Sequence, residues 1–303
     1  MTRPVTSPSG VIEARPVLGA AAMLANTVFV PIIGVTVKAL TALGVGAFEM
    51  LAGRAWLTFL LLLPLLCFES NRRAILSADL RAHAVHAAFA ISTMACFYFA
   101  LRTLPIVTVT AINFTTPIFT LILARILYHE RVAPLGWAAL LAGFVGAIIV
   151  LRPGTAGIGW DSFVVVLGSL LAAGMNLAVR RMPAHSTNYA VVFYFSLAGA
   201  LVYGAAGAPY MTVPEPEEWV WFVTLAVTAI LVHTCVAIAY RMASSVLVGA
   251  LDYGRILWAA LIGYFVLSEV PDLTDALGIV LIVISGLVVL GLSTRPAPPQ
   301  GTT

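Results

Sequence analysis

The sequence predicts an all-α integral membrane protein with ten transmembrane helices, arranged as two five-helix repeats of opposite orientation. Hydrophobic residues make up 61% of the 303 residues and charged residues 10%, whereas a soluble domain carries about 25% charged residues. The apolar residues fall into runs of about 20, the length that a helix needs to cross a bilayer. Two parts of the chain also match each other at a fixed spacing, which indicates a repeat.

The apolar runs are separated by short breaks that carry charged or turn-forming residues. The breaks are too short to fold as soluble domains. The first run is too long for a signal peptide and has no small-residue cleavage pattern, so we expect it to span the membrane. The predicted spans are 17–37, 45–67, 82–101, 106–127, 134–151, 160–180, 188–207, 218–240, 246–267 and 273–292.

These spans group into two units. We expect residues 17–156 to form the first five-helix repeat and residues 157–292 to form the second. The Pro-rich ends, 1–16 and 293–303, are predicted to be disordered cytoplasmic tails. The cysteines lie in apolar runs far apart in the sequence, so we expect no disulfide framework.

The basic residues predict the orientation. If the amino terminus is cytoplasmic, most of the arginines fall on the cytoplasmic side, which is the positive-inside pattern. We therefore expect a bacterial inner-membrane protein with both termini in the cytoplasm. The net charge of +3 follows from this orientation and gives no reason to expect a nucleic-acid partner.

Segment 97–151 matches segment 236–290 without gaps, at a spacing of 139 residues. Five spans separate the two copies, and because five is odd the copies cross the membrane in opposite directions. Inverted repeats are typical of transporters that alternate between inward-open and outward-open states around a site at mid-membrane. The aligned pairs include Arg102 with Arg241, Asn113 with Asp252, Phe114 with Tyr253, and Glu130 with Glu269.

Two further features concern packing. Small residues recur in the fifth and tenth spans, among them Gly146, Gly278 and Ser285, and they allow close approach of helix backbones. We expect these two spans to be packing elements or a dimer surface. Glu130 and Glu269 stand just before the next helices, where we expect them to cap the amino ends.

The chain contains "ALR.LP" at 100–105, Glu130 at the end of the fourth span, and "D..R" at 252–255 followed by "SEVPD" at 268–272. In these motifs it resembles the drug/metabolite transporter superfamily, specifically the ten-helix transporters built from two EamA repeats. The resemblance extends from about residue 17 to 292 and implies a carrier of small organic metabolites, often an exporter of amino acids or their derivatives. The first span reads "MLANTVFVP" and lacks the Trp-Gly that many relatives carry.

Four ionisable residues fall inside predicted spans: Glu49 and Arg54 in the second, Asp252 and Arg255 in the ninth. An unpaired charge there costs about 2.5–3.5 kcal/mol, so each must face a partner or a hydrated cavity. Asp252 and Arg255 are three residues apart and can pair on one helix face. Glu49 and Arg54 are five apart and lie on different faces, so we expect Arg54 to face another helix or a cavity.

We therefore predict a substrate site at mid-membrane, where an arginine attracts a carboxylate and an acidic group binds an amine or carries a proton. Each residue could instead only bind helices together, and this interpretation is favoured for Arg255 because Asp252 already satisfies it. The predicted substrate-binding residues are Asn26, Glu49, Arg54, Tyr98, Asn113, Asn176, His233, Asp252, Tyr253 and Arg255.

The sequence contains no metal-ligand cluster, no nucleophile motif and no nucleotide-binding motif. We therefore expect no catalytic residue, metal or cofactor, and transport by facilitated diffusion or by coupling to an ion gradient. The expected partners are a small-molecule substrate and the lipid bilayer, for a monomer or a homodimer.

The leading hypothesis is a secondary transporter that exports a small metabolite. The resemblance and the intramembrane arginines favour an amino acid with a hydrophobic or aromatic side chain. The alternatives are a carrier for another metabolite, such as a nucleoside, a vitamin or a sulfonium compound, including uptake. An intramembrane enzyme is a less favoured alternative.

Overall fold

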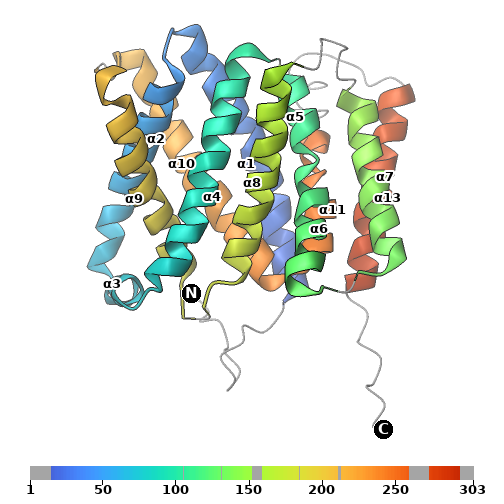
Figure 1. Ribbon diagram of the computed structural model, residues 1–303. Coiled ribbons are helices and arrows are strands. Elements are labelled where there is room, and N and C mark those ends of the chain that lie inside the picture. The colour runs from blue at the N-terminus through green and yellow to red at the C-terminus, as the bar shows by residue number, and fades with distance from the viewer. Residues whose placement is uncertain are drawn as a thin grey trace.

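The protein is a bundle of upright helices (Figure 1). Every regular element in the described part of the chain is a helix, which confirms the all-α membrane fold. Among the described residues, seven helices are long and apolar enough to cross a membrane, and two shorter apolar helices accompany them. The computed structural model describes residues 15–104, 106–130, 132–151, 159–183, 185–210, 213–258 and 273–293.

The first half of the chain supplies the first five predicted spans. The fourth of these is divided into two helices, α5 and α6, and a short 3-10 helix, η1, with α3 connects the second span to the third. The elements are α1 (Pro16–Ala42), α2 (Ala47–Leu62), η1 (Leu63–Cys67), α3 (Glu69–Leu76), α4 (Leu80–Thr103), α5 (Ile106–Asn113), α6 (Thr116–Tyr128) and α7 (Pro134–Leu151).

The second half follows the same order. Its ninth predicted span begins as α11, and the part of that span beyond Trp258 lies outside the described residues. The elements are α8 (Trp160–Arg180), α9 (Asn188–Gly207), η2 (Ala208–Tyr210), α10 (Pro216–Met242), α11 (Ser245–Asp252) and α13 (Leu273–Ser293).

Side-chain caps fix where several helices begin. Asp79 accepts hydrogen bonds from the backbone N–H groups of Arg81 and Ala82 at the start of α4. Thr187 caps α9 in the same way, and Ser244 caps α11. The first N–H groups of a helix have no acceptor within the helix. Each cap therefore provides an acceptor for N–H groups that would otherwise lack a hydrogen bond within the protein.

The most extensive helix contacts join the two halves of the chain. They pair α1 with α10, α4 with α8, α2 with α9, and α7 with α13. This set of pairs is unchanged when each helix is exchanged for its counterpart in the other half. In Figure 1, α1 begins and α13 ends at the same lower edge of the bundle. Two inverted five-helix repeats would produce this pairing.

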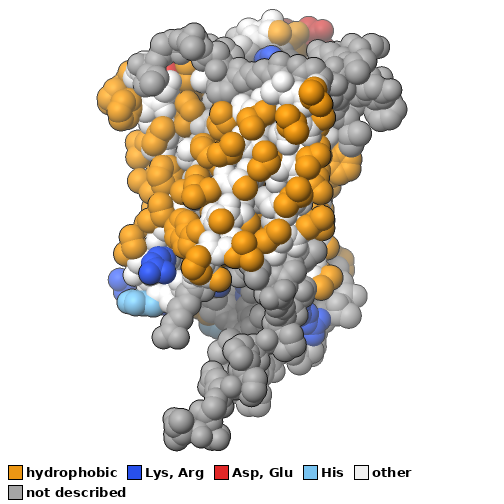
Figure 2. All heavy atoms as spheres, turned by 90° about the vertical axis from the view of Figure 1, so that its right-hand side faces the viewer, with side chains coloured by type: hydrophobic (Ala, Val, Ile, Leu, Met, Phe, Trp, Pro, Cys, Tyr) orange, Lys and Arg blue, Asp and Glu red, His pale blue; other side chains and the backbone are white. Residues whose placement is uncertain are grey.

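The fifth and tenth spans, α7 and α13, pack closely through small residues. A Cβ added at Gly146 would lie 2.7 Å from the carbonyl oxygen of Gly278, and the Ser285 hydroxyl donates to the carbonyl of Ala139 at 2.6 Å. The predicted packing role of these spans is confirmed. Figure 2 looks onto this side and shows hydrophobic side chains over most of its height, as a lipid-facing surface requires.

Candidate functional site

The fourth and ninth spans both stop being regular helix at corresponding positions. α5 ends at Asn113 and α6 begins at Thr116, while α11 ends at Asp252 and a turn follows at Tyr253. Asn113 and Asp252 are the residues that the repeat aligns. Discontinuous helices at matching points of two inverted repeats are the usual framework of a transport site.

Proline explains one break. Pro117 has no N–H group to donate to the carbonyl of Asn113, four residues earlier, so the helix loses a hydrogen bond at that point. The hydroxyl of Thr115 donates to the carbonyl of Ile112 at 2.7 Å, and the hydroxyl of Thr116 donates to the side-chain oxygen of Asn113 at 3.5 Å. Polar side chains thus take over from the regular helical pattern.

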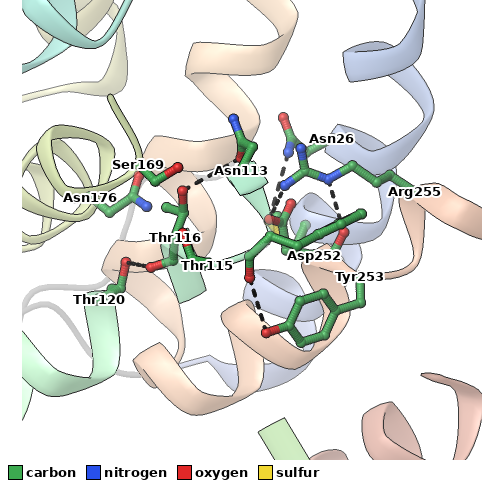
Figure 3. A network of polar contacts seen from close by, with 12 residues as sticks. Asn26, Asn113, Thr115, Thr116, Thr120, Ser169, Asn176, Asp252, Tyr253 and Arg255 are labelled. Carbon is green, nitrogen blue, oxygen red and sulfur yellow. Dashed lines mark hydrogen bonds and ion pairs between the residues drawn. The ribbon is translucent and has the colours of Figure 1, made fainter. Parts of the chain in front are cut away.

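The two breaks contact each other. The Tyr253 hydroxyl donates to the carbonyl oxygen of Phe114 at 3.3 Å, and the two ring centroids are 5.4 Å apart. Both side chains are fully buried. Figure 3 marks this hydrogen bond of the Tyr253 hydroxyl with a dashed line. The repeat-related residues Phe114 and Tyr253 therefore connect the two halves at the centre of the bundle.

An ion pair lies beside this contact. The Arg255 guanidinium pairs with the Asp252 carboxylate, and both side chains are about one-tenth exposed (11% and 10%). The same guanidinium lies 4.6 Å from the centroid of the Phe114 ring, a cation–π contact. The predicted pairing of Asp252 with Arg255 is confirmed.

α1 closes one side of the pair. In Figure 3 Asn26 is drawn with the residues of this network, and its amide nitrogen donates to the Met23 sulfur at 3.9 Å. The Trp258 indole donates to the hydroxyl of Thr27 at 3.0 Å, which holds the chain after the break against α1. Among the described residues, the buried side-chain oxygen of Asn26 has no hydrogen-bond partner. It is an unused acceptor on α1.

A second polar cluster surrounds Arg54 on α2, which is 3% exposed. One terminal nitrogen donates to the Met94 sulfur at 2.7 Å, and the other lies 3.4 Å from Nε2 of His233. Tyr98 interacts electrostatically with the same guanidinium. Arg54 therefore reaches across to α4 and α10, as expected, and has no carboxylate partner within the described part of the chain.

A small cavity adjoins Arg54. Its volume is about 10 Å³, room for about one water molecule. Thr58, Ser196 and Tyr203 contribute polar atoms to its wall. The Nε atom of Arg54 and the hydroxyl of Tyr98 are buried and have no hydrogen-bond partner among the described residues. An unused donor on Arg54, which lines the cavity, is what a site for a polar ligand would present.

The structure gathers most of the predicted residues into these two clusters. Asn176 lies on α8, and its amide donates to the Tyr240 hydroxyl of α10 at 3.1 Å. Asn26, Asn113, Asp252, Tyr253 and Arg255 are at the breaks, and Arg54, Tyr98 and His233 are in the second cluster.

Glu49 requires a correction. The sequence predicts it deep in the second span, but α2 begins at Ala47, so Glu49 is half-buried in the first turn of the helix. A carboxylate there is favoured by the positive end of the helix dipole. Glu49 thus lies at an end of its helix and not with Arg54 in the middle of it.

Glu130 also differs from expectation. Its carboxylate binds a terminal nitrogen of Arg180 at 2.5 Å and accepts a hydrogen bond from the Ser245 hydroxyl at 3.3 Å. These partners lie on α8 and α11, so Glu130 connects the halves, and among the described residues no backbone N–H group of α7 donates to it. Its repeat counterpart, Glu269, lies outside the described residues.

Some residues of the clusters were not predicted from the sequence. Met94 and Phe195 lie against Arg54 or His233, and Tyr240 accepts a hydrogen bond from the Asn176 amide. Single apolar or aromatic residues in an apolar span carry no distinguishing pattern. Phe114 differs from these residues, because the repeat aligns it with Tyr253 in the sequence.

Comparison with known proteins identifies the family. The profile of the EamA-like transporter family matches residues 17–152 and 159–291. The chain belongs to the EamA-like transporter family. It is therefore a multi-pass membrane transporter of the drug/metabolite superfamily, which acts on a small molecule and resides in a lipid bilayer.

Similar transporters differ in their named substrates. An S-adenosylmethionine uptake transporter of Rickettsia felis is 22% identical, over 80% of this chain and 83% of its own. A riboflavin transporter of Brucella anthropi is 25% identical, over 75% and 82%. A pseudopaline exporter of Pseudomonas aeruginosa is 26% identical, over 63% and 68%.

One solved crystal structure shares the fold. It superposes with a TM-score of 0.75 at 18% identity and covers 92% of this chain and 96% of its own chain. At this identity the likeness establishes the architecture alone.

Proposed function

We propose that this EamA-family transporter exports amino acids by alternating access, with hydrophobic or aromatic side chains favoured. The substrate would bind where the broken fourth and ninth spans meet. The observation that carries the proposal is the buried Asp252–Arg255 ion pair at that point, which adjoins the aromatic ring of Phe114.

A zwitterion suits such a pair. An amino acid carries a carboxylate and an ammonium group on one carbon atom, so Arg255 can bind the carboxylate while Asp252 binds the ammonium. All four charges then remain matched after the substrate enters. A substrate of single charge would leave one protein charge unpaired in a low-dielectric site, which costs several kcal/mol.

The neighbouring groups support an amino acid with an apolar side chain. The unpartnered oxygen of Asn26 can accept a further hydrogen bond from the ammonium group. The rings of Phe114 and Tyr253 offer an apolar wall beside the charges, and aromatic rings pack well against aliphatic and aromatic side chains.

Arg54 would provide a second position on the pathway. Its guanidinium has donor capacity to spare and is balanced only by neutral groups among the described residues. We propose that it attracts the substrate carboxylate, and that His233, 3.4 Å away, takes part in proton movement.

Uptake of a sulfonium compound is the second candidate. Its support is the likeness to the S-adenosylmethionine uptake transporter. S-adenosylmethionine also has an amino-acid end, so the Asp252–Arg255 pair could bind it in the same way. A transport assay that includes this compound separates the two candidates.

We further propose the membrane arrangement that the sequence predicts: repeats at 17–156 and 157–292, an inner-membrane location and cytoplasmic termini. The ends of α1 and α13 at one edge of the bundle support it (Figure 1). So does the position of Arg180 and Arg241, which end α8 and α10 at the predicted cytoplasmic side.

Counterflow in proteoliposomes tests this function. Vesicles preloaded with unlabelled phenylalanine, leucine, S-adenosylmethionine or riboflavin would be supplied with the same labelled compound outside. Transient accumulation of chemically unchanged label, strongest for phenylalanine or leucine, is expected.

Two results would contradict the proposal. Accumulation of S-adenosylmethionine or riboflavin without either amino acid would exclude amino acids as the favoured substrates. Conversion of the label into a product would indicate an enzyme. Empty liposomes serve as the control for leakage.

A further inference from the structure

A groove opens on the outer face of the bundle, away from both polar clusters. Its volume is about 590 Å³, and it lies between the halves of α4, α6 and α8 that end at the lower edge of Figure 1. The walls are apolar, and several of their side chains are exposed: Val85 by 47%, Leu127 by 55% and Leu170 by 41%. In a bilayer these surfaces would face acyl chains.

α8 forms the floor of the groove. A Cβ added at Gly174 would lie 2.7 Å from Cε1 of the Phe89 ring, so the glycine lets this ring of α4 lie directly on α8. α4 and α6 belong to the first half of the chain and α8 to the second. The groove therefore runs along a junction between the two halves.

Two arginines stand at the lower end of the groove. Arg81 is in the first turn of α4 and Arg181 follows the last residue of α8, and both side chains line the opening. The Arg181 guanidinium lies 4.0 Å from the centroid of the Tyr128 ring, which holds it in place.

These two positive charges are only partly balanced locally. Asp79 also lines the opening, and its carboxylate, which accepts the backbone N–H groups of Arg81 and Ala82 as a helix cap, offsets one of the two charges. Within the described residues, neither arginine forms an ion pair. The lower end of the groove is thus cationic and exposed, whereas the rest of the groove is apolar and would lie in the bilayer.

We propose that this groove binds a phospholipid of the cytoplasmic leaflet. An acyl chain would lie in the groove, and Arg81 and Arg181 would bind the lipid phosphate. The assignment to this leaflet rests on the predicted orientation, whereas the site does not depend on the proposed substrate. Basic residues at the membrane surface attract anionic lipids, and arginine binds phosphate with paired donors.

The position suggests a structural effect. A lipid that contacts α4, α6 and α8 together would stabilise the junction between the halves. α6 ends next to Glu130, which binds Arg180 of α8. Lipid binding would therefore stabilise this contact between the two halves.

Native mass spectrometry of the delipidated, detergent-solubilised full chain tests the proposal. The probes are dioleoyl phosphatidylglycerol, dioleoylglycerol and glycerol 3-phosphate. We expect a single tightly bound phosphatidylglycerol, a rise in the unfolding midpoint on its addition, and at least tenfold weaker binding of the other two probes. Equal binding of dioleoylglycerol, or of glycerol 3-phosphate, would overturn the proposal, because phosphate and acyl chain are both required.

Variants locate the site. The double variant Arg81→Gln/Arg181→Gln should weaken phosphatidylglycerol binding at least fivefold, and Leu170→Trp, which fills the groove, should do the same without altering charge. Arg72→Gln removes an exposed arginine of α3 near the same edge and should leave binding unchanged. Wild-type affinity in both groove variants, or an equal loss in Arg72→Gln, would refute this site. Leu170→Trp keeps the test decisive if the double variant fails to fold.

Discussion

At the scale of single residues, two buried arginines are stabilised in different ways. Arg255 has a carboxylate partner three residues away, so its charge is neutralised within its own segment. Arg54 contacts a thioether and an imidazole, and neither group carries a negative charge to neutralise the guanidinium. A buried charge balanced only by neutral groups costs stability, and its presence is understandable where the charge serves a ligand.

Arg54→Ala should abolish counterflow, by at least tenfold, while leaving the unfolding midpoint within a few degrees of the wild type. The reason is that alanine removes the unbalanced charge and the donors that face the cavity. Counterflow and thermal unfolding of the purified variant measure both effects. Arg72→Ala, at an exposed position, is the control, and normal transport by Arg54→Ala would place Arg54 outside the site.

Asp252→Asn should destabilise the protein by about 3 kcal/mol, because it leaves Arg255 buried without a counter-charge. The double variant Asp252→Leu/Arg255→Met should recover most of this stability and still fail to transport. Unfolding midpoints and counterflow of the same preparations check the two statements. Transport by the double variant would show that the pair only stabilises the fold at the break.

The sequence predicts part of this site for clear reasons. The pairing of Asp252 with Arg255 follows from their spacing of three residues in the chain, and the contact between Phe114 and Tyr253 corresponds to the repeat register. The partners of Glu130 could not be predicted, because Arg180 is 50 residues away in the chain. The depth of Glu49 depends on where the second helix begins. α2 begins at Ala47, two residues after the predicted start of the span, so Glu49 lies in its first turn.

At the scale of elements, the site depends on how closely the broken helices approach. α11 meets α6 at Gly249, where an added Cβ would lie 2.9 Å from the Cβ of Pro117. The proline that interrupts the fourth span thus also rests against the ninth. A larger residue at Gly249 would push the two breaks apart. This holds even for leucine, which has a higher helix propensity than glycine.

Gly249→Leu should lower the unfolding midpoint by several degrees and reduce counterflow at least tenfold. The matched control is Gly34→Leu in α1, where an added Cβ would meet nothing within 4 Å. The control should be neutral or slightly stabilising. Equal behaviour of the two variants would contradict the close approach of α6 and α11.

At the scale of the whole molecule, the two halves are joined at the centre and again at the predicted cytoplasmic edge. The central contact is Phe114 with Tyr253. At the edge, Glu130 of the first half binds Arg180 and Ser245 of the second. A carrier that alternates between two open states must break one such closure while the central site is occupied.

Glu130→Gln should weaken the closure at the edge. We expect a cysteine introduced at Thr116, in a cysteine-free background, to react several times faster with a membrane-impermeant maleimide applied from the cytoplasmic side. Arg73→Gln breaks an exposed ion pair with Glu69 on α3 and serves as the control. An unchanged rate in Glu130→Gln would show that this ion pair does not close the pathway.

The most direct test of the central claim is an experimental structure with the transported metabolite bound. The expected ligand position is at the two helix breaks, with its carboxylate on Arg255 and its ammonium group on Asp252 beside Phe114. A ligand bound elsewhere, with the Asp252–Arg255 pair intact and out of contact, would contradict the account.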